Sequence, residues 1–145
     1  MGHVAISALC LLFLAAFLQG ACAAGPSKSQ MKQALRMVRN ICQPKTGAST
    51  AAIDGIMKGR FPDDDRLKEY CNCILGLMKL MKNNKFDADG GLANIEKLPE
   101  SLKGPLKEGV TKCRKADAGT TEARESAYAV VKCMYNAIPD QFIFP

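Results

Sequence analysis

Residues 63–81 read DDDRLKEYCNCILGLMKLM, and this stretch decides the fold class. Three aspartates open it, and carboxylates suit a helix N-terminus because the unpaired backbone N–H groups there favour negative charge. Apolar side chains then recur three and four positions apart, which is the spacing of one helix face. The stretch therefore predicts an amphipathic helix that begins after Asp65 and ends at Asn83 and Asn84. The residues on its apolar side are Leu67, Tyr70, Cys73, Ile74, Leu77 and Met81.

Helical spacing of apolar residues continues on both sides of this segment. A capping-box pattern from Ser27 to Gln30 starts one helix, which Pro44 and Gly47 end. Pro105 suits the first turn of another helix, and no segment alternates convincingly as a strand does. We therefore expect an all-α chain with about six amphipathic helices. Their approximate ranges are 27–43, 50–58, 65–82, 92–98, 105–113 and 120–138.

The first 24 residues read as a secretory signal peptide and not as part of the domain. Every residue from Val4 to Leu18 is apolar or small. This run suits a signal core but is shorter than the ~20 residues of a membrane-spanning helix. Small residues follow, and we expect cleavage after Ala23 or Ala24. The sequence thus predicts a secreted, extracellular protein with one domain over residues 25–145.

The cysteines predict a disulfide framework with one thiol left over. Of seven in the chain, Cys10 and Cys22 lie in the signal segment. The five that remain are an odd number in an oxidising compartment, so at least one has no intramolecular partner. These five are Cys42, Cys71, Cys73, Cys113 and Cys133.

The residue types that are absent limit the chemistry. The only histidine, His3, lies in the signal segment, so the domain can build neither a Ser-His-Asp nor a Cys-His arrangement. Histidine metal ligands are missing for the same reason. The formal net charge of +6 comes from basic residues that are scattered among acidic ones, which is not typical of a nucleic-acid-binding surface. We predict that the protein is not an enzyme and that it binds no metal, no cofactor and no nucleic acid.

The cysteine spacing resembles that of the insect odorant-binding protein family, of the pheromone-binding and general odorant-binding type. The resemblance extends over nearly the whole domain. It includes the segments Phe61-Pro62-Asp63-Asp64, Asn72-Cys73, Phe86-Asp87-Ala88-Asp89-Gly90 and the tail Phe142-Ile143-Phe144-Pro145. Members of that family have six cysteines, paired first with third, second with fifth and fourth with sixth.

The resemblance implies two disulfides here, Cys42–Cys73 and Cys113–Cys133. The family spacing places the missing second and fifth cysteines at Glu69 and Arg124, so the chain is similar to four-cysteine, or minus-C, members. Because these replacements have opposite charge, we hypothesise an ion pair between Glu69 and Arg124, with surface positions that merely coincide as the alternative. Cys71 is then the unpaired thiol. It is interpreted as a small buried residue, and the alternatives are a reactive thiol or an intermolecular disulfide.

The resemblance also implies an internal apolar cavity that the C-terminal tail helps to form. Sequence alone does not separate cavity lining from ordinary core, so the following residues are expectations. We expect one hydroxyl, that of Tyr128, to orient the ligand, while burial of apolar surface drives binding. The residues expected to line the cavity are Leu77, Met81, Leu92, Ile95, Leu106, Val110, Val130, Met134, Phe142, Ile143 and Phe144, together with Tyr128.

Two other segments partly match metal-binding motifs. The stretch from Lys85 to Glu96 nearly matches a calcium loop, with Asp87, Asp89 and Gly90 in place, but a lysine occupies the first ligand position. A plain turn is the better interpretation. The pair Cys71-Asn72-Cys73 lacks the spacing and the second ligand pair of a zinc site.

The resulting prediction is a secreted carrier that binds odorants, pheromones or similar small hydrophobic molecules and transports them through aqueous fluid to membrane receptors. Its expected partners are a small apolar ligand, a chemosensory membrane receptor and, in a homodimer, a second copy. A non-sensory carrier of hormones, lipids or toxicants is the alternative within binding proteins. A basic membrane-active defence protein is the alternative from another class.

Overall fold

The computed structural model describes residues 26–145, and the predicted signal segment 1–24 lies outside them. This part of the chain is mostly helical, with six helices and one short hairpin, which confirms the predicted all-α class and number of helices. The elements are α2 (Lys28–Thr46), α3 (Thr50–Ile56), α4 (Asp65–Leu77), β1 (Met81–Lys82), β2 (Lys85–Phe86), α5 (Ala88–Ile95), α6 (Glu100–Cys113) and α7 (Ala123–Ala137).

Helix starts follow the side-chain caps that the sequence predicts. Ser27 and Gln30 form a reciprocal capping box at the start of α2. Asp64 caps α4, where one carboxylate oxygen accepts from the backbone N–H of Arg66 at 2.8 Å and of Leu67 at 3.1 Å. Local hydrogen bonding therefore fixes these boundaries.

Two prolines lie inside helices, whereas the sequence analysis placed Pro44 at a helix end and Pro105 in a first turn. Helix α2 continues past Pro44 to Thr46, and α6 begins five residues before Pro105. Because proline has no backbone N–H, each of the two leaves the carbonyl four residues earlier without its helical hydrogen bond. Those carbonyls belong to the exposed residues Asn40 and Ser101, where water can replace the lost bond.

Helix α4 ends at Leu77, five residues before the predicted end at residue 82. The backbone turns at Lys79, whose φ is 57°, and the Leu80 N–H donates to the Leu75 carbonyl at 2.8 Å. This pattern is a Schellman helix end, in which a left-handed residue closes the last turn. The released residues form the β1–β2 hairpin, with Asn83 and Asn84 in its left-handed turn.

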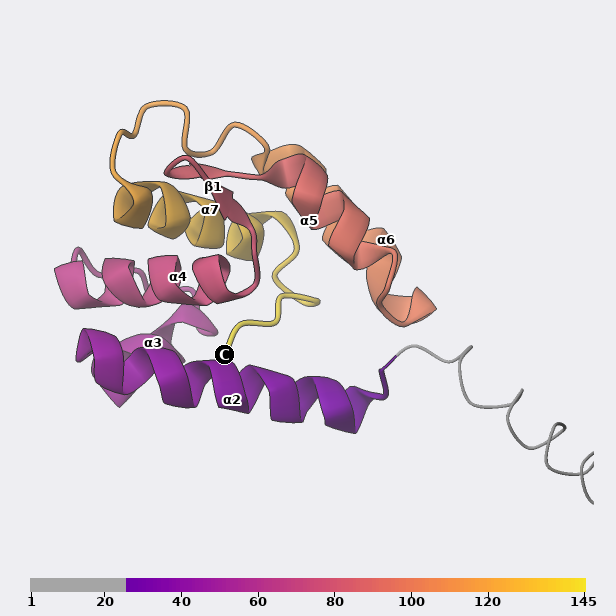
Figure 1. The fold of residues 1–145 in the computed structure, drawn as a ribbon, viewed down its shortest axis with the longest axis horizontal. Helices are drawn as coiled ribbons and strands as arrows, with labels where there is room; N and C mark the ends of the chain where they lie inside the picture. The colour runs from indigo at the N-terminus through magenta and orange to yellow at the C-terminus, as the bar shows by residue number, and fades with distance from the viewer. Residues whose placement is uncertain (1–25) are drawn as a thin grey trace, which may run out of the picture.

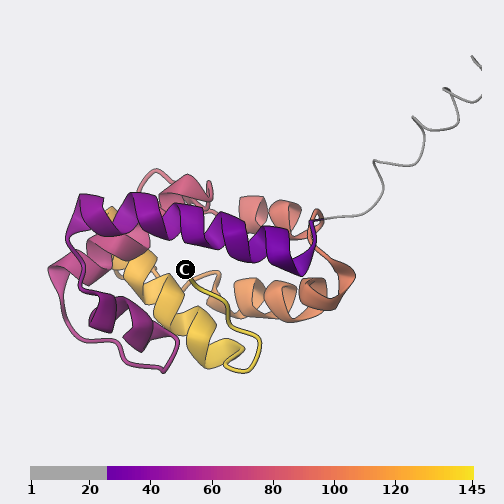
Figure 2. The same cartoon turned by 90° about the horizontal axis from the view of Figure 1, so that it is seen from below.

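The helices form a bundle in which α4 and α7 pack side by side at the centre (Figure 1). Helix α2 packs against α4, and the α5–α6 pair packs against α7 from the other end. Seen from below, α2 crosses in front of the bundle, and the C-terminus lies between α2 and α7 in the view (Figure 2). The main core fills the space around α4 and α7, and a smaller cluster lies between α5 and α6. The largest fully buried side chains are Tyr70, Ile53, Ile56, Leu67, Ile74, Val130 and Val131.

Two disulfides hold neighbouring helices together. Cys42–Cys73 joins α2 to α4, and Cys113–Cys133 joins α6 to α7, with Cα–Cα distances of 5.7 and 5.8 Å. Their sequence separations of 31 and 20 residues correspond to roughly 3 to 4 kcal/mol each in the loop-entropy treatment of the unfolded chain. Both bonds are the ones that the resemblance implied.

Candidate functional site

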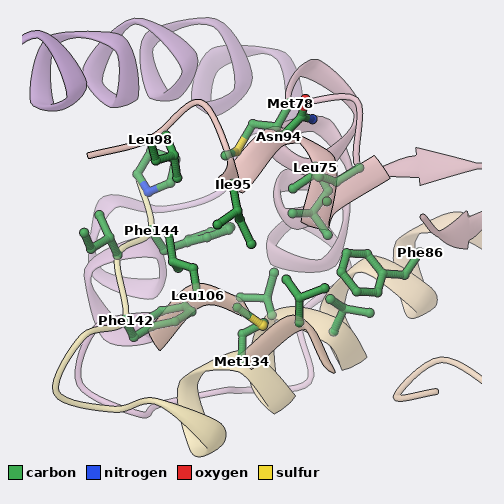
Figure 3. A pocket seen from close by; sticks show the side chains of 17 residues that line it. Leu75, Met78, Phe86, Asn94, Ile95, Leu98, Leu106, Met134, Phe142 and Phe144 are labelled. Carbon is green, nitrogen blue, oxygen red and sulfur yellow. The ribbon is translucent and has the colours of Figure 1, made fainter. Parts of the chain in front are cut away.

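An apolar cavity of about 200 Å³ lies between α4, α5, α6, α7, the hairpin and the C-terminal tail (Figure 3). Hydrocarbon and thioether groups form nearly all of its wall. Such a surface gains free energy by burying an apolar molecule. The residues that line it are Leu75, Met78, Leu80, Phe86, Gly91, Asn94, Ile95, Leu98, Leu106, Val110, Val130, Val131, Met134, Phe142, Ile143, Phe144 and Pro145.

Helix α5 and the turn after it supply one wall. Gly91, Asn94, Ile95 and Leu98 follow one another at helical spacing, so they share the side that faces the cavity. Gly91 brings the backbone close to the hairpin, because a Cβ there would lie 3.5 Å from the Leu80 side chain. In Figure 3, Ile95 lies near the centre of the cavity, and Leu98 lies at one edge.

The hairpin is held in place by the loop before α7. The Lys85 ammonium donates to the Asp117 carbonyl at 2.6 Å, and the Phe86 N–H donates to the buried Asp117 carboxylate at 2.8 Å. These bonds satisfy groups that would be costly to bury unpaired. They also fix the side chain of Phe86 in the cavity wall.

The C-terminal tail forms the opposite wall and is tied to the core. The buried Tyr70 hydroxyl donates to the Pro145 oxygen at 2.7 Å. Phe142 packs edge-on against Tyr135 with ring centroids 5.5 Å apart, and Phe144 packs edge-on against Tyr70 at 6.1 Å. The tail is therefore a packed part of the cavity.

The structure places eight of the twelve predicted lining residues on the cavity wall. They come from α5, α6, α7 and the tail. The apolar stripe of each of these three helices faces the cavity. These eight are Ile95, Leu106, Val110, Val130, Met134, Phe142, Ile143 and Phe144.

Leu77 and Met81 lie elsewhere, because the helix predicted to contain both ends between them. Leu77 is the last residue of α4 and is 48% exposed. Met81 lies in β1 and packs against the main core. Expecting these two in the lining was wrong for this reason.

Leu92 and Tyr128 also lie off the cavity. Leu92 packs against the small cluster between α5 and α6. The Tyr128 hydroxyl donates to the Pro62 carbonyl at 2.6 Å, and its ring packs edge-on against Phe61. Tyr128 therefore anchors the loop before α4 and does not point toward the site as expected.

Several lining residues were missed by the sequence analysis. Leu75 lies on α4, and Met78 lies at its C-terminal end. Both are next to the apolar stripe predicted for this helix and not part of it, and the turn at Lys79 follows directly. Asn94 lies three and four residues from Gly91 and Leu98 on one face, but a polar side chain does not form part of an apolar stripe. That spacing was the available signal. The full missed set is Leu75, Met78, Leu80, Phe86, Gly91, Asn94, Leu98, Val131 and Pro145.

The hypothesised ion pair between Glu69 and Arg124 is wrong. Arg124 lies 3.0 Å from Glu122 and 3.7 Å from Asp65, while Glu69 accepts from Asn72 at 3.2 Å. Glu69 is exposed on α4, so its side chain reaches neighbours on its own helix. Two salt bridges therefore join α4 to α7, Arg124–Asp65 at 3.7 Å and Lys68–Glu125 at 3.0 Å, and neither uses Glu69.

Cys71 is a free thiol with no exposed surface, in the main core and away from the cavity wall. Burial raises its pKa to about 12, because a thiolate there would lose its hydration. This placement matches the interpretation as a small buried residue.

The carboxylates of the calcium-loop pattern have other partners. Asp87 caps α5 by accepting from the Gly90 N–H at 2.9 Å. A hydrogen bond from Arg114 lowers the pKa of Asp89, and one from Lys107 lowers the pKa of Glu96. The segment is thus a hairpin end and a helix start with surface ion pairs.

Residues 26–145 contain no helix with the length and hydropathy needed to cross a membrane.

Comparison with known proteins places this geometry in a family. The sequence profile of the PBP/GOBP family matches residues 24–137. The chain belongs to this family. General odorant-binding protein 19a of Drosophila melanogaster is 32% identical over 126 residues, which cover 84% of this chain and 86% of that protein.

Solved structures of PBP/GOBP-like proteins share the fold. Odorant binding protein 4 of Chrysopa pallens superposes with a TM-score of 0.77 at 33% identity, covering 83% of this chain and 99% of that one. Odorant binding protein 5 of Apis mellifera gives a TM-score of 0.77 at 31% identity, covering 84% and 100%. These relatives are binding proteins by name and not enzymes, in agreement with the prediction that this chain is not an enzyme.

Proposed function

We propose that this PBP/GOBP-family chain is a secreted carrier that holds one small hydrophobic molecule in the cavity between α4, α5, α6, α7 and the tail. The observation on which this depends is the cavity itself. It is apolar and about 200 Å³ in volume, and its wall includes a C-terminal tail anchored by Tyr70. The names of the relatives support odorants as ligands. We propose that pheromones are bound in the same way and that the role is transport of the ligand through aqueous fluid to membrane receptors.

Binding of the fluorescent probe N-phenyl-1-naphthylamine tests the carrier function. We expect probe fluorescence to rise on binding residues 25–145 and to fall when an aliphatic ligand displaces the probe. Leu106 lies on the cavity wall, and a tryptophan there would occupy the space of the ligand. The Leu106→Trp variant should bind the probe at least about tenfold more weakly, which corresponds to about 1.4 kcal/mol.

Leu102→Trp is the matched control, because Leu102 lies one turn earlier on α6 and off the cavity wall. It should bind the probe as wild type does. Equal loss in both variants, or no probe binding by wild type, would contradict the proposed function. Leakage of anionic lipid vesicles on addition of the protein would favour the membrane-active alternative.

We further propose that the chain is a four-cysteine, minus-C member. Support comes from the two disulfides, which use Cys42, Cys73, Cys113 and Cys133, while Cys71 is free. Peptide mapping of non-reduced protein should recover these two cross-linked pairs and an unlinked peptide that contains Cys71. A third cross-link would contradict the assignment.

A further inference from the structure

The cavity wall contains one polar side chain among its 17 described residues, that of Asn94 (Figure 3). The others are aliphatic, aromatic, thioether, proline or glycine. An isolated amide in such a wall stands out, because polar groups in binding pockets are few and fix the orientation and the choice of ligand. Asn94 lies beside Met78 at one edge of the cavity in Figure 3.

The helix end holds Asn94 in position through its backbone. Asn94 lies one residue before the last residue of α5, and its carbonyl accepts from the Glu96 and Lys97 N–H groups. Its side chain is half-buried. The amide oxygen lies 3.5 Å from the exposed Lys97 ammonium, which is at the outer limit of a hydrogen bond.

The side-chain contact of Asn94 within residues 26–145 is the one from Lys97 to its amide oxygen, so its amide NH2 has no hydrogen-bond acceptor among these residues. A half-buried donor of this kind gains a partner when a ligand offers an acceptor. Pro145, another lining residue, ends in a carboxyl group, which offers oxygens only and already accepts from Tyr70 at 2.7 Å. A ligand carbonyl can therefore find a side-chain donor in the wall at Asn94, whereas a ligand hydroxyl could donate to either group.

We propose that Asn94 is the specificity-determining residue of the cavity and selects apolar molecules that contain a carbonyl group, such as ketones or esters, by donating a hydrogen bond from Nδ2. This inference rests on the proposed carrier function and names the chemical class of the ligand. The hydrocarbon part of the ligand lies among Ile95, Leu106, Val110 and Met134, and its carbonyl lies at the edge near Met78.

A pair of ligands of matched shape tests the proposal. Octan-2-one and 2-methyloctane differ by an oxygen in place of a methyl group, and both are measured by displacement of N-phenyl-1-naphthylamine. In Asn94→Leu, we expect affinity for the ketone to fall by about 2- to 12-fold, the range of one net hydrogen bond. Affinity for the alkane should stay the same or rise, so the ratio of the two affinities is the readout.

Two further variants separate loss of the donor from a change in shape. Asn94→Asp keeps the size of the side chain and removes the donor, so it should also bind the ketone more weakly. If Asn94→Leu does not fold, this variant still tests whether the donor is needed. Asn40→Leu makes the same exchange at an exposed position on α2 and should leave both affinities unchanged. An unchanged ketone-to-alkane ratio in both Asn94 variants would overturn the proposal while leaving the carrier function intact. Absence of probe binding by wild type would overturn the carrier function itself.

Discussion

Lys68 Nζ on α4 lies 3.0 Å from Glu125 Oε1 on α7, and this salt bridge joins the two central helices. The same ammonium pairs with Asp63 and lies 5.9 Å from the centre of the Tyr128 ring. The side chain of Lys68 is 11% exposed, so the charge lies at the helix interface. The link lies one residue from the expected Glu69–Arg124 pair on each helix, and its charges are reversed.

Lys68→Met should lower stability at neutral pH by removing this link. A hydrogen bond from Lys68 lowers the pKa of Asp63 below its ordinary 3.8, and the hydrogen bonds that Lys68 donates to Asp63 and Glu125 raise the pKa of Lys68. The Asp63 contribution is therefore present above its ordinary pKa and is lost as the pH falls through its lowered value. The contribution of Lys68 to stability is lost only at strongly alkaline pH, as the pH rises through its raised pKa. The urea midpoints of wild type and variant should differ at pH 7 and approach each other near pH 3.

Lys112→Met is the control, since the Lys112–Glu108 pair lies within α6 and both side chains are more than half exposed. Exposed pairs of this type contribute little, so its midpoint should match wild type at both pH values. A midpoint difference for Lys68→Met that is the same at pH 7 and pH 3 would contradict the assigned role of Asp63.

Cys71 should resist thiol reagents in the folded protein. It is fully buried, and its pKa of about 12 leaves almost no thiolate at pH 8. Titration of residues 25–145 with 5,5′-dithiobis(2-nitrobenzoic acid) should detect one thiol per chain in concentrated urea and almost none without it. Rapid labelling of the folded protein, or a dimer on a non-reducing gel, would refute this assignment.

Gly109→Ala should change ligand binding with little change in fold. A Cβ at Gly109 would lie 2.8 Å from the terminal methyl of Met134, a flexible side chain on the cavity wall. Displacing that thioether into the cavity reduces the space for ligand. We expect weaker probe binding, by about three- to tenfold, with native helical circular dichroism.

Gly104→Ala is the matched control on the same helix, because a Cβ there would meet nothing within 4 Å. It should bind the probe like wild type, because the added methyl group does not reach the cavity wall. Equal weakening of binding in both variants would show that α6 as a whole, and not Met134, is responsible.

Tyr70→Phe should loosen the C-terminal tail. It leaves the buried Pro145 oxygen without the donor that now lies 2.7 Å away, at a cost of about 1 to 3 kcal/mol. Burial raises the pKa of Tyr70 to about 12, so the hydroxyl keeps its proton at neutral pH. Probe release, measured by stopped-flow fluorescence, should be faster than in wild type.

Tyr128→Phe provides the comparison for that experiment. It also removes a hydrogen bond from a tyrosine hydroxyl, to the Pro62 carbonyl, but away from the cavity. We expect some loss of stability and an unchanged release rate. Faster release in both variants would indicate a general effect of stability and not of the tail.

The sequence by itself determined the features that depend on local chemistry. Capping side chains at Ser27 and Asp64 and the helical spacing of apolar residues indicated six helices, because each signal acts within a few residues of the chain. The resemblance in cysteine spacing then indicated which helices are joined. Helical spacing also identified most of the apolar residues of α5, α6 and α7 that lie on the cavity wall, because residues three and four positions apart share one helix face.

Tertiary structure decided which face of each helix meets which neighbour. Leu75 lines the cavity and Leu77 is exposed because they lie on different faces of α4, and packing decides which face meets a neighbour. The chain then reverses at Lys79, where the backbone adopts a left-handed conformation that apolar periodicity does not encode. The tail is a wall because Tyr70 and Pro145, 75 residues apart in sequence, form a hydrogen bond. Contacts over such separations exist only once the helices have packed, and they turn an apolar stripe into a cavity.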